Sequence, residues 1–304
     1  MEQTMKDGIE FIFVNDCTKD RSIEILKKVV SEYPERSNQV KIVNHETNKG
    51  LAAARNTGMQ HAIGEYVLHI DSDDWANSNM ISNMYEEAVG NNEVDIVVCD
   101  YYGVYEHSSI IYSQKIASNG KSYFKSMLRG EVIYAPWNKL IRRAIFANHK
   151  INWIENLNMW EDVSVIPRIV YHARKIIHIE SPLYYYNQQN SLSYSKNWNK
   201  RALENVWQSY NIICDFAQSN SDADQYASDL KKFSMNAEFT LISHVNKSNV
   251  DLVTKSFPKI SLIDIFESNL PLYKKISFVF INQSFYRTGH LLLKIADSIK
   301  NKVR

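Results

Sequence analysis

An acidic cluster is the sequence feature with the clearest chemistry. Asp71, Asp73 and Asp74 fall within four residues, directly after an apolar run. Carboxylates this close repel one another unless a cation lies among them. Oxygen ligands at this density suit Mg²⁺ or Mn²⁺, which also take phosphate oxygens from a substrate. The alternative is an Asp-rich helix cap, and Asp74 in particular could cap a following helix.

Other polar residues follow or open further apolar patterns. Asn15 and Asp16 end the first apolar run, residues 48–56 open a helical pattern, and Glu161 and Asp162 lie at the start of another. Ligands of α/β proteins bind at the carboxyl ends of the strands. We therefore expect these polar residues to converge at one edge of a sheet.

The elements that must position these residues alternate between strand and helix. Apolar runs predict strands over 9–14, 40–43, 65–70, 94–99 and 175–180, and helical spacing predicts helices over about 20–33, 50–62, 80–88, 122–129 and from 158. Such alternation predicts an α/β fold, a mostly parallel sheet flanked by helices. From about residue 198 to residue 304 the pattern is helical throughout.

Composition and charge exclude several classes of protein. A hydrophobic fraction of 44% indicates a folded globular chain, and a formal net charge of +1 gives no reason to expect nucleic acid as a partner. The three cysteines, Cys17, Cys99 and Cys214, form no metal-binding pair and indicate a reducing compartment. The sequence shows no signal peptide and no membrane-spanning run, so a cytoplasmic location is expected.

The order of the motifs resembles the family 2 glycosyltransferases. The match runs through VND…TxD…NxGLxxARNxG…GEYxxxxDSDDW…WNKLxRRxxF…EDxxxxP. This resemblance implies a GT-A domain, Rossmann-like, over residues 1–195 and an α-helical C-terminal region over 196–304. It also implies an inverting transfer of sugar from a nucleotide sugar, expected to be UDP-linked, to a glycan or lipid-linked acceptor in the synthesis of a bacterial-type surface polysaccharide.

The resemblance assigns the donor side of the site. Asp16 would accept a hydrogen bond from the nucleotide base, and Lys49 and Arg55 would lie near the diphosphate or the base. The DSDD segment would supply the metal and sugar contacts. Its members are Asp73 for Mn²⁺ or Mg²⁺, Asp71 for the metal and the sugar or ribose, and Ser72 beside them.

The resemblance also assigns the acceptor side. Asp162 would act as the general base that takes the proton of the acceptor hydroxyl, while Glu161 would face the acceptor or, alternatively, pair with Asn158 in a helix cap. Trp137 and Trp160 could stack on sugars, as could Trp75, and core packing is the alternative for each. His69 is expected to be buried and hydrogen-bonded.

Two departures from the family pattern keep a second function open. Cys17 stands where the family usually has glycine, which carries a cost if the backbone there needs a positive φ. The chain also lacks the strand and helix with which the family usually begins. A catalytically silent scaffold or nucleotide-sugar-binding protein is the alternative. A nucleotidyltransferase fits less well, because it gives NKGLAAARN and Glu161-Asp162 no role.

The last segment is basic. Residues 272–304 contain seven Lys and Arg residues against Asp297 alone, a net charge of +6. With its apolar residues, the segment could form an amphipathic helix at the inner face of an anionic membrane. The alternative is a helix packed on the protein with a solvated basic face.

Overall fold

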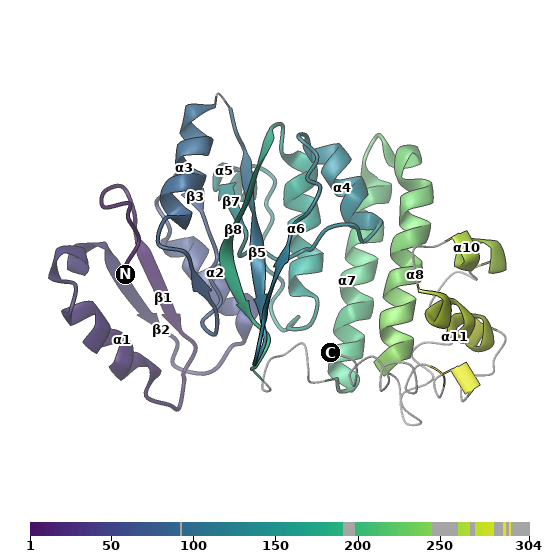
Figure 1. The fold of residues 1–304 in the computed structure, drawn as a ribbon, viewed down its shortest axis with the longest axis horizontal. Coiled ribbons are helices and arrows are strands. Elements are labelled where there is room, and N and C mark those ends of the chain that lie inside the picture. The colour runs from purple at the N-terminus through teal and green to yellow at the C-terminus, as the bar shows by residue number, and fades with distance from the viewer. Residues whose placement is uncertain are drawn as a thin grey trace. The chain divides into compact units, whose positions relative to one another are not determined.

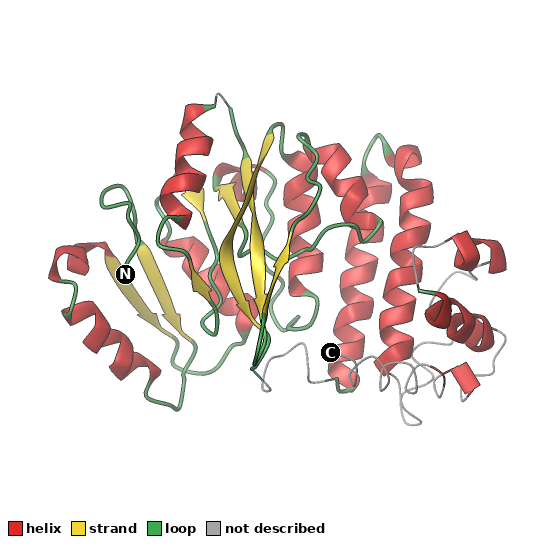
Figure 2. Ribbon diagram, in the orientation of Figure 1, coloured by secondary structure: helices red, strands yellow, loops and turns green. Residues whose placement is uncertain are grey.

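Strands and helices alternate through the first 190 residues (Figures 1 and 2). The computed structural model describes residues 1–91, 93–190, 198–244, 261–267, 271–282, 288–289 and 292. The strands are β1 Phe11–Asn15, β2 Val40–Asn44, β3 Tyr66–Val67, β4 Trp75–Ala76, β5 Ile96–Val104, β6 Ser109–Tyr112, β7 Lys139–Arg142 and β8 Ile176–Asn187. The helices are α1 Ser22–Ser31, α2 Leu51–His61, α3 Met80–Gly90, α4 Gly120–Leu128, α5 Ala144–Asn148 and α6 Glu161–His172, with a 3-10 turn at Pro34–Gln39.

The strands form two sheets. β1 and β2 pair in parallel as a two-stranded sheet, and the other six follow the order β3-β7-β5-β8-β4 with β6 beside β5. Among the described strands of the larger sheet, β5 and β8 form a parallel pair and the other neighbours pair antiparallel, so the sheet is mixed and the expectation of a mostly parallel sheet is wrong. β5 and β6 form a hairpin, and two-residue β4 and four-residue β7 join as antiparallel strands.

One hydrophobic core lies between the larger sheet and α3. Met80, Met84 and Ala88 of α3 are buried with alternate residues of β5, among them Val97 and Cys99. Figure 1 shows α3 on one side of β5 and β8, with α4 and α6 on the other. The predicted α/β class is thus confirmed.

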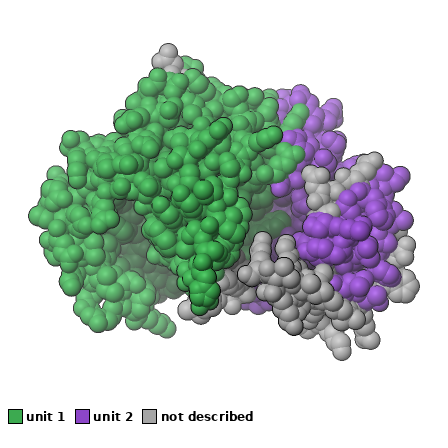
Figure 3. All heavy atoms as spheres, viewed as in Figure 1, with its two compact units in different colours: residues 1–127, 131–196 green, residues 128–130, 197–304 purple. Residues whose placement is uncertain are grey.

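Figure 3 shows two compact units, residues 1–127 with 131–196 and residues 128–130 with 197–304. The described part of the second unit is helical. It contains α7 Lys200–Ser219, a 3-10 turn at Ala223–Tyr226, α8 Ala227–His244, α10 Leu262–Glu267 and α11 Leu272–Asn282. Among the described residues, none of the helices is both long and apolar enough to cross a bilayer. Most of the basic tail lies outside the described residues, including Arg287, Lys294, Asp297, Lys300, Lys302 and Arg304.

Candidate active site

Asp16 joins the loop after β1 to the turn before α2. Its Oδ1 accepts the backbone N–H of Lys49 at 2.8 Å, and its Oδ2 accepts that of Gly50 at 2.7 Å. His45 Nδ1 lies 2.7 Å from the same Oδ1. Burial raises the pKa of Asp16, but these three hydrogen bonds outweigh it and leave the pKa below its ordinary value. The carboxylate is therefore ionised and fixed, while the Lys49 side chain is exposed.

Cys17 and Gly50 both have positive φ values in these loops, +58° and +88°. Gly50 precedes the first residue of α2 and tolerates this conformation without strain. Cys17 carries a Cβ, so the cost anticipated for a cysteine at this position applies.

Arg55 connects two acidic motifs that are far apart in the sequence. Its Nη1 donates to Glu161 Oε1 at 2.5 Å and its Nη2 to Asp71 Oδ1 at 2.9 Å. The guanidinium carbon lies 4.5 Å from the centroid of the Trp153 ring. Burial alone would lower the pKa of Arg55, but the two carboxylates raise it above its ordinary value. A buried cation thus holds Asp71 and Glu161 in one place.

The three aspartates of the DSDD segment turn to different partners. Asp71 accepts a hydrogen bond from Arg55, whereas Asp73 Oδ2 accepts one from Asn190 Nδ2 at 2.7 Å. These separate protein donors offset part of the repulsion between the two carboxylates. Asp73 and Ser72 are exposed.

Asp74 is fixed to the end of β8. The Tyr184 hydroxyl donates to its Oδ2 at 2.7 Å, and the backbone N–H of Asn187 donates to its Oδ1 at 2.8 Å. Burial raises the pKa of Asp74 to about 6. The interpretation of Asp74 as a helix cap is wrong, because α3 begins only at Met80, after Asn79.

The fit of a divalent metal depends on Asp73. Within the described ranges no group of three His, Cys, Asp or Glu residues is arranged to hold a metal ion. Mg²⁺ commonly binds one or two carboxylates and completes its coordination with substrate phosphates and water. The exposed Asp73 carboxylate fits that pattern, since a carboxylate has about four acceptor positions and Asn190 is the partner of one. One carboxylate oxygen of Asp71 already accepts a hydrogen bond from Arg55.

Glu161 and Asp162 begin helix α6. The sequence offers Asn158 as the N-cap of this helix, but the structure differs. Trp160 takes that position, with a φ of +60°. Glu161 is buried against Arg55, and burial raises its pKa. Asp162 Oδ1 accepts the N–H of Val163 at 2.8 Å.

The Asp162 carboxyl lies in a mixed electrostatic field. Burial raises its pKa, and the charge of Asp71 adds to the rise, while Arg55 and Lys139 oppose it. The net direction is upward. Asp162 therefore interacts with Asp71 of the DSDD segment and with Arg55, which binds Asp71.

The tryptophans predicted on the acceptor side differ in exposure. Trp137 is 5% exposed and stacks on Tyr184 with 4.4 Å between ring centroids, so the core-packing alternative describes it. Trp160 is half-buried beside Glu161, and Trp75 is exposed.

His69 differs from the expectation in one respect. Its Nε2 is buried but has no hydrogen-bond partner in the described part of the chain, so the expected bond is not made. The ring meets Trp153 edge to face at 5.3 Å between centroids. Burial, with Arg55 nearby, lowers the pKa of His69 to about 3, and the ring is neutral.

Sequence reasoning missed several supporting residues. Lys139 is fully buried and donates to Ala135 O at 2.7 Å and Asn138 Oδ1 at 2.8 Å, and burial lowers its pKa to about 7. The sequence signal for Lys139 is a charged residue at the start of the apolar segment that becomes β7. Trp153 and Asn190 had no comparable signal, because only the fold brings them to the site.

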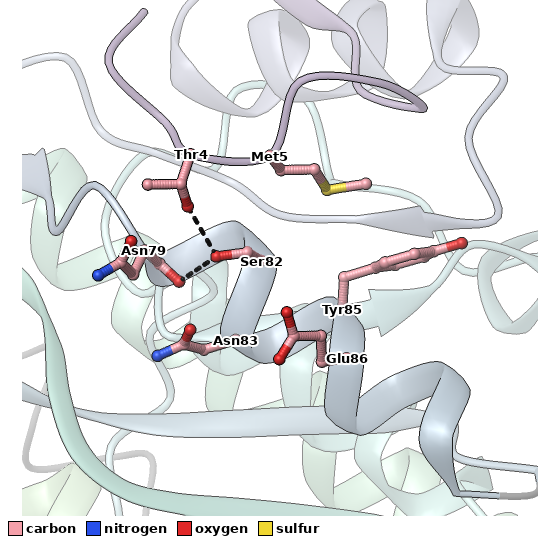
Figure 4. Close-up of a pocket in the computed structure, with 7 residues that line it drawn as sticks. All are labelled: Thr4, Met5, Asn79, Ser82, Asn83, Tyr85 and Glu86. Carbon is pink, nitrogen blue, oxygen red and sulfur yellow. Dashed lines mark hydrogen bonds between the residues drawn. The ribbon is translucent and has the colours of Figure 1, made fainter.

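A separate pocket of about 580 Å³ lies between the N-terminal segment and α3. Figure 4 shows its lining residues, Thr4, Met5, Asn79, Ser82, Asn83, Tyr85 and Glu86. Thr4 Oγ1 and Ser82 Oγ lie 2.9 Å apart across it. None of the predicted site residues lines this pocket.

Residues 1–149 match the family described as Glycosyl transferase family 2. The putative glycosyltransferase EpsH of Bacillus subtilis (strain 168) is 32% identical over 238 residues, which cover 76% of this chain and 67% of EpsH. The chain belongs to glycosyltransferase family 2. An uncharacterized glycosyltransferase of the same organism, EpsJ, is 30% identical over 201 residues. These residues cover 56% of EpsJ.

Solved structures show the fold of this family 2 glycosyltransferase. The S. aureus TarS fragment 1–349 in complex with UDP-GlcNAc matches with a TM-score of 0.69 at 16% identity, covering 99% of this chain and 85% of that one. The mannosyltransferase PcManGT from Pyrobaculum calidifontis, in complex with GDP-Man and Mn²⁺, matches with a TM-score of 0.51 at 15% identity, covering 99% and 80%. The expected GT-A fold is thus confirmed.

Proposed function

We propose that this glycosyltransferase moves a sugar from a UDP-linked donor to a glycan or lipid-linked acceptor, with inversion, in the synthesis of a bacterial surface polysaccharide. The observation that supports this most is the Arg55 bridge. Through it, Asp71 of the segment proposed for the donor and Glu161, the neighbour of Asp162, bind the same guanidinium group. TarS has been captured with UDP-GlcNAc, which supports a UDP-linked donor.

The donor nucleotide would lie along the loops after β1 and before α2. The Asp16 carboxylate accepts three hydrogen bonds and retains about one acceptor position for a ring N–H of the base. Lys49, whose side chain is exposed, can reach a diphosphate. Arg55 is buried between carboxylates, so we propose that it orients Asp71 toward the sugar and acts on the diphosphate only through its charge.

Transfer would proceed as a single displacement. Asp162 takes the proton of an acceptor hydroxyl, whose oxygen attacks the anomeric carbon. The bond from that carbon to the diphosphate oxygen breaks on the opposite face, and its electron pair leaves with the diphosphate. A Mn²⁺ or Mg²⁺ ion held by Asp73, with Asp71 on the sugar side, would neutralise the charge of the leaving group. Trp160 and Glu161, next to Asp162, would face the acceptor.

Donor binding tests this function directly. Thermal shifts with a panel of nucleotide sugars and Mn²⁺ should show stabilisation by at least one UDP-sugar, about 2.7 kcal/mol at a hundredfold excess over Kd. Asp73→Asn should remove the Mn²⁺-dependent part, whereas the exposed control Asp7→Asn should not. A chain that no donor stabilises would instead be the silent scaffold.

We further propose that the second unit contacts an anionic membrane, which would bring the enzyme to lipid-linked acceptors at the inner face. Leu272, Ile276 and Phe280 lie four residues apart along α11, and all are exposed, Leu272 by 67%. Such spacing places them on one face of the helix. The basic residues of 272–304 would add electrostatic attraction.

A further inference from the structure

Three aromatic residues lie side by side across the larger sheet. Trp75 of β4 is the register partner of Tyr185 in β8, and Tyr185 is the register partner of Tyr102 in β5. Partners in register point to the same side of a sheet. We call these three residues the aromatic ladder.

The rings of the aromatic ladder are stacked. The centroids of Trp75 and Tyr185 are 5.6 Å apart with planes 10° from parallel, and those of Tyr185 and Tyr102 are 4.8 Å apart at 11°. Tyr185 therefore covers one face of the Trp75 indole. Among the described strands β4 is the last in the sheet order, so none of them follows on its other side.

Trp75 is nevertheless 45% exposed. With its inner face stacked on Tyr185, this area must belong to the outer face and the edge of the indole. The aromatic residues on the other side of the strands behave differently, since Tyr101, Tyr184 and Trp137 are all buried in the core. Core packing thus explains those residues and leaves the outer face of Trp75 without a role.

The aromatic ladder is continuous with the acidic segment. Trp75 directly follows Asp74, and Asn187 stands two residues after Tyr185 on the same side of β8. Asn187 Nδ2 donates to the carbonyl oxygen of Asp73 at 3.1 Å. A ligand on Trp75 would therefore lie next to the segment proposed for the donor.

We infer that the outer face of Trp75 binds a pyranose ring of the acceptor saccharide, an inference that rests on the proposed glycosyl transfer. A pyranose presents a face of C–H groups that packs on an aromatic ring, and its hydroxyls remain in water. The stack on Tyr185 fixes the indole in advance, which lowers the entropy lost on binding. The chemistry fits a sugar better than a peptide, because the surface is one flat ring beside amides and carboxylates.

The acceptor is a better occupant than the donor sugar. Tyr184 and Tyr185 are successive residues of β8, so their rings point to opposite sides of the sheet. The Tyr184 hydroxyl contacts Asp74 and the backbone N–H of Asp71, so its ring is not part of the aromatic ladder. The outer face of Trp75 is a surface beside the carboxylates proposed for the donor, which reach Arg55 and Asn190 instead.

The first experiment compares steady-state kinetics of Trp75→Ala with the parent protein, using chitotetraose, cellotetraose and maltotetraose as acceptors. The acceptor KM should rise about fivefold to tenfold, while the donor KM and the slow hydrolysis of donor by water stay unchanged. Trp75→Tyr, which keeps a stacking ring, should restore the acceptor KM to within about twofold. Phe266→Ala removes a similarly exposed ring from α10 and should change nothing. An unchanged acceptor KM in Trp75→Ala, or a higher donor KM instead, would overturn the inference.

The second experiment separates this subsite from the transfer reaction. Saturation-transfer NMR with the same three oligosaccharides, without donor, should show saturation of pyranose C–H protons by the parent protein and none by Trp75→Ala. That result supports the subsite even if no donor is turned over. Equal saturation by both proteins, or none by the parent, would count against the subsite even if transfer were observed.

Discussion

At the scale of single residues, Arg55 organises the candidate site. Its two hydrogen bonds, to Asp71 and Glu161, connect motifs that the sequence separates by 16 and 106 positions. A buried cation between two carboxylates is favourable only while all three groups remain, because each would be an uncompensated charge without the others. This interdependence can be measured.

A double-mutant cycle on Arg55 and Glu161 measures it. Arg55→Met should lower the free energy of unfolding by about 3–5 kcal/mol, because it leaves Glu161 buried without its partner. Adding Glu161→Gln should recover part of that loss, with a coupling energy of about 1–3 kcal/mol in urea denaturation. The exposed pair Arg21 and Glu24 is the matched control, and its cycle should give a much smaller coupling energy, because solvent screens the two charges. Additive effects at Arg55 and Glu161 would show that the bridge is not formed.

At the scale of elements, local patterns in the sequence predicted most helices and strands, while pairing was not predictable. Apolar runs and helical spacing located β1, β2, α2 and α6 within a few residues. The direction of β7 and β4 depends on contacts with β5 and β8, which are remote in sequence, so the mixed sheet could not be read from local patterns. The prediction of Asp74 as a helix cap was wrong for a similar reason. Its carboxylate accepts a hydrogen bond from Tyr184, which is remote in sequence, and does not cap the next helix.

The loop after β1 offers a test at this scale. Cys17→Gly should raise the free energy of unfolding by about 1 kcal/mol, since glycine adopts the +58° φ of this position without a Cβ clash. Cys17→Ala retains the Cβ and serves as the control, with no gain expected. Chemical denaturation of the two variants decides the matter, and equal stability would mean that the loop is not strained.

At the scale of the whole molecule, the sequence indicated the family and the order of its motifs but not how the motifs meet. Asp16, Asp71, Asp73 and Asp162 were named from their motifs, yet the Arg55 bridge and the support from Trp153 and Asn190 depend on tertiary contacts. The helical character of the C-terminal region could be predicted because its apolar spacing is local. The exposed apolar face of α11 could not be predicted in this way, because exposure depends on tertiary packing.

That face predicts membrane contact by the second unit. The parent protein should float with phosphatidylglycerol vesicles but not with phosphatidylcholine vesicles, and added salt should weaken the association. Replacing Leu272, Ile276 and Phe280 together with Gln should reduce flotation severalfold, whereas Ile63→Gln, at an exposed position of the other unit, should not. Equal flotation by the triple variant and the parent would favour a helix packed on the protein.

The most direct test of the proposed transfer is the turnover of Asp162→Asn with a UDP-sugar donor that stabilises the parent protein. The carboxamide keeps the size of the side chain but cannot take a proton from the acceptor hydroxyl. We predict donor binding within about twofold of the parent and a loss of transfer of about 10²–10⁴-fold. Transfer at the parent rate would contradict the assignment of Asp162 as the base and the mechanism built on it.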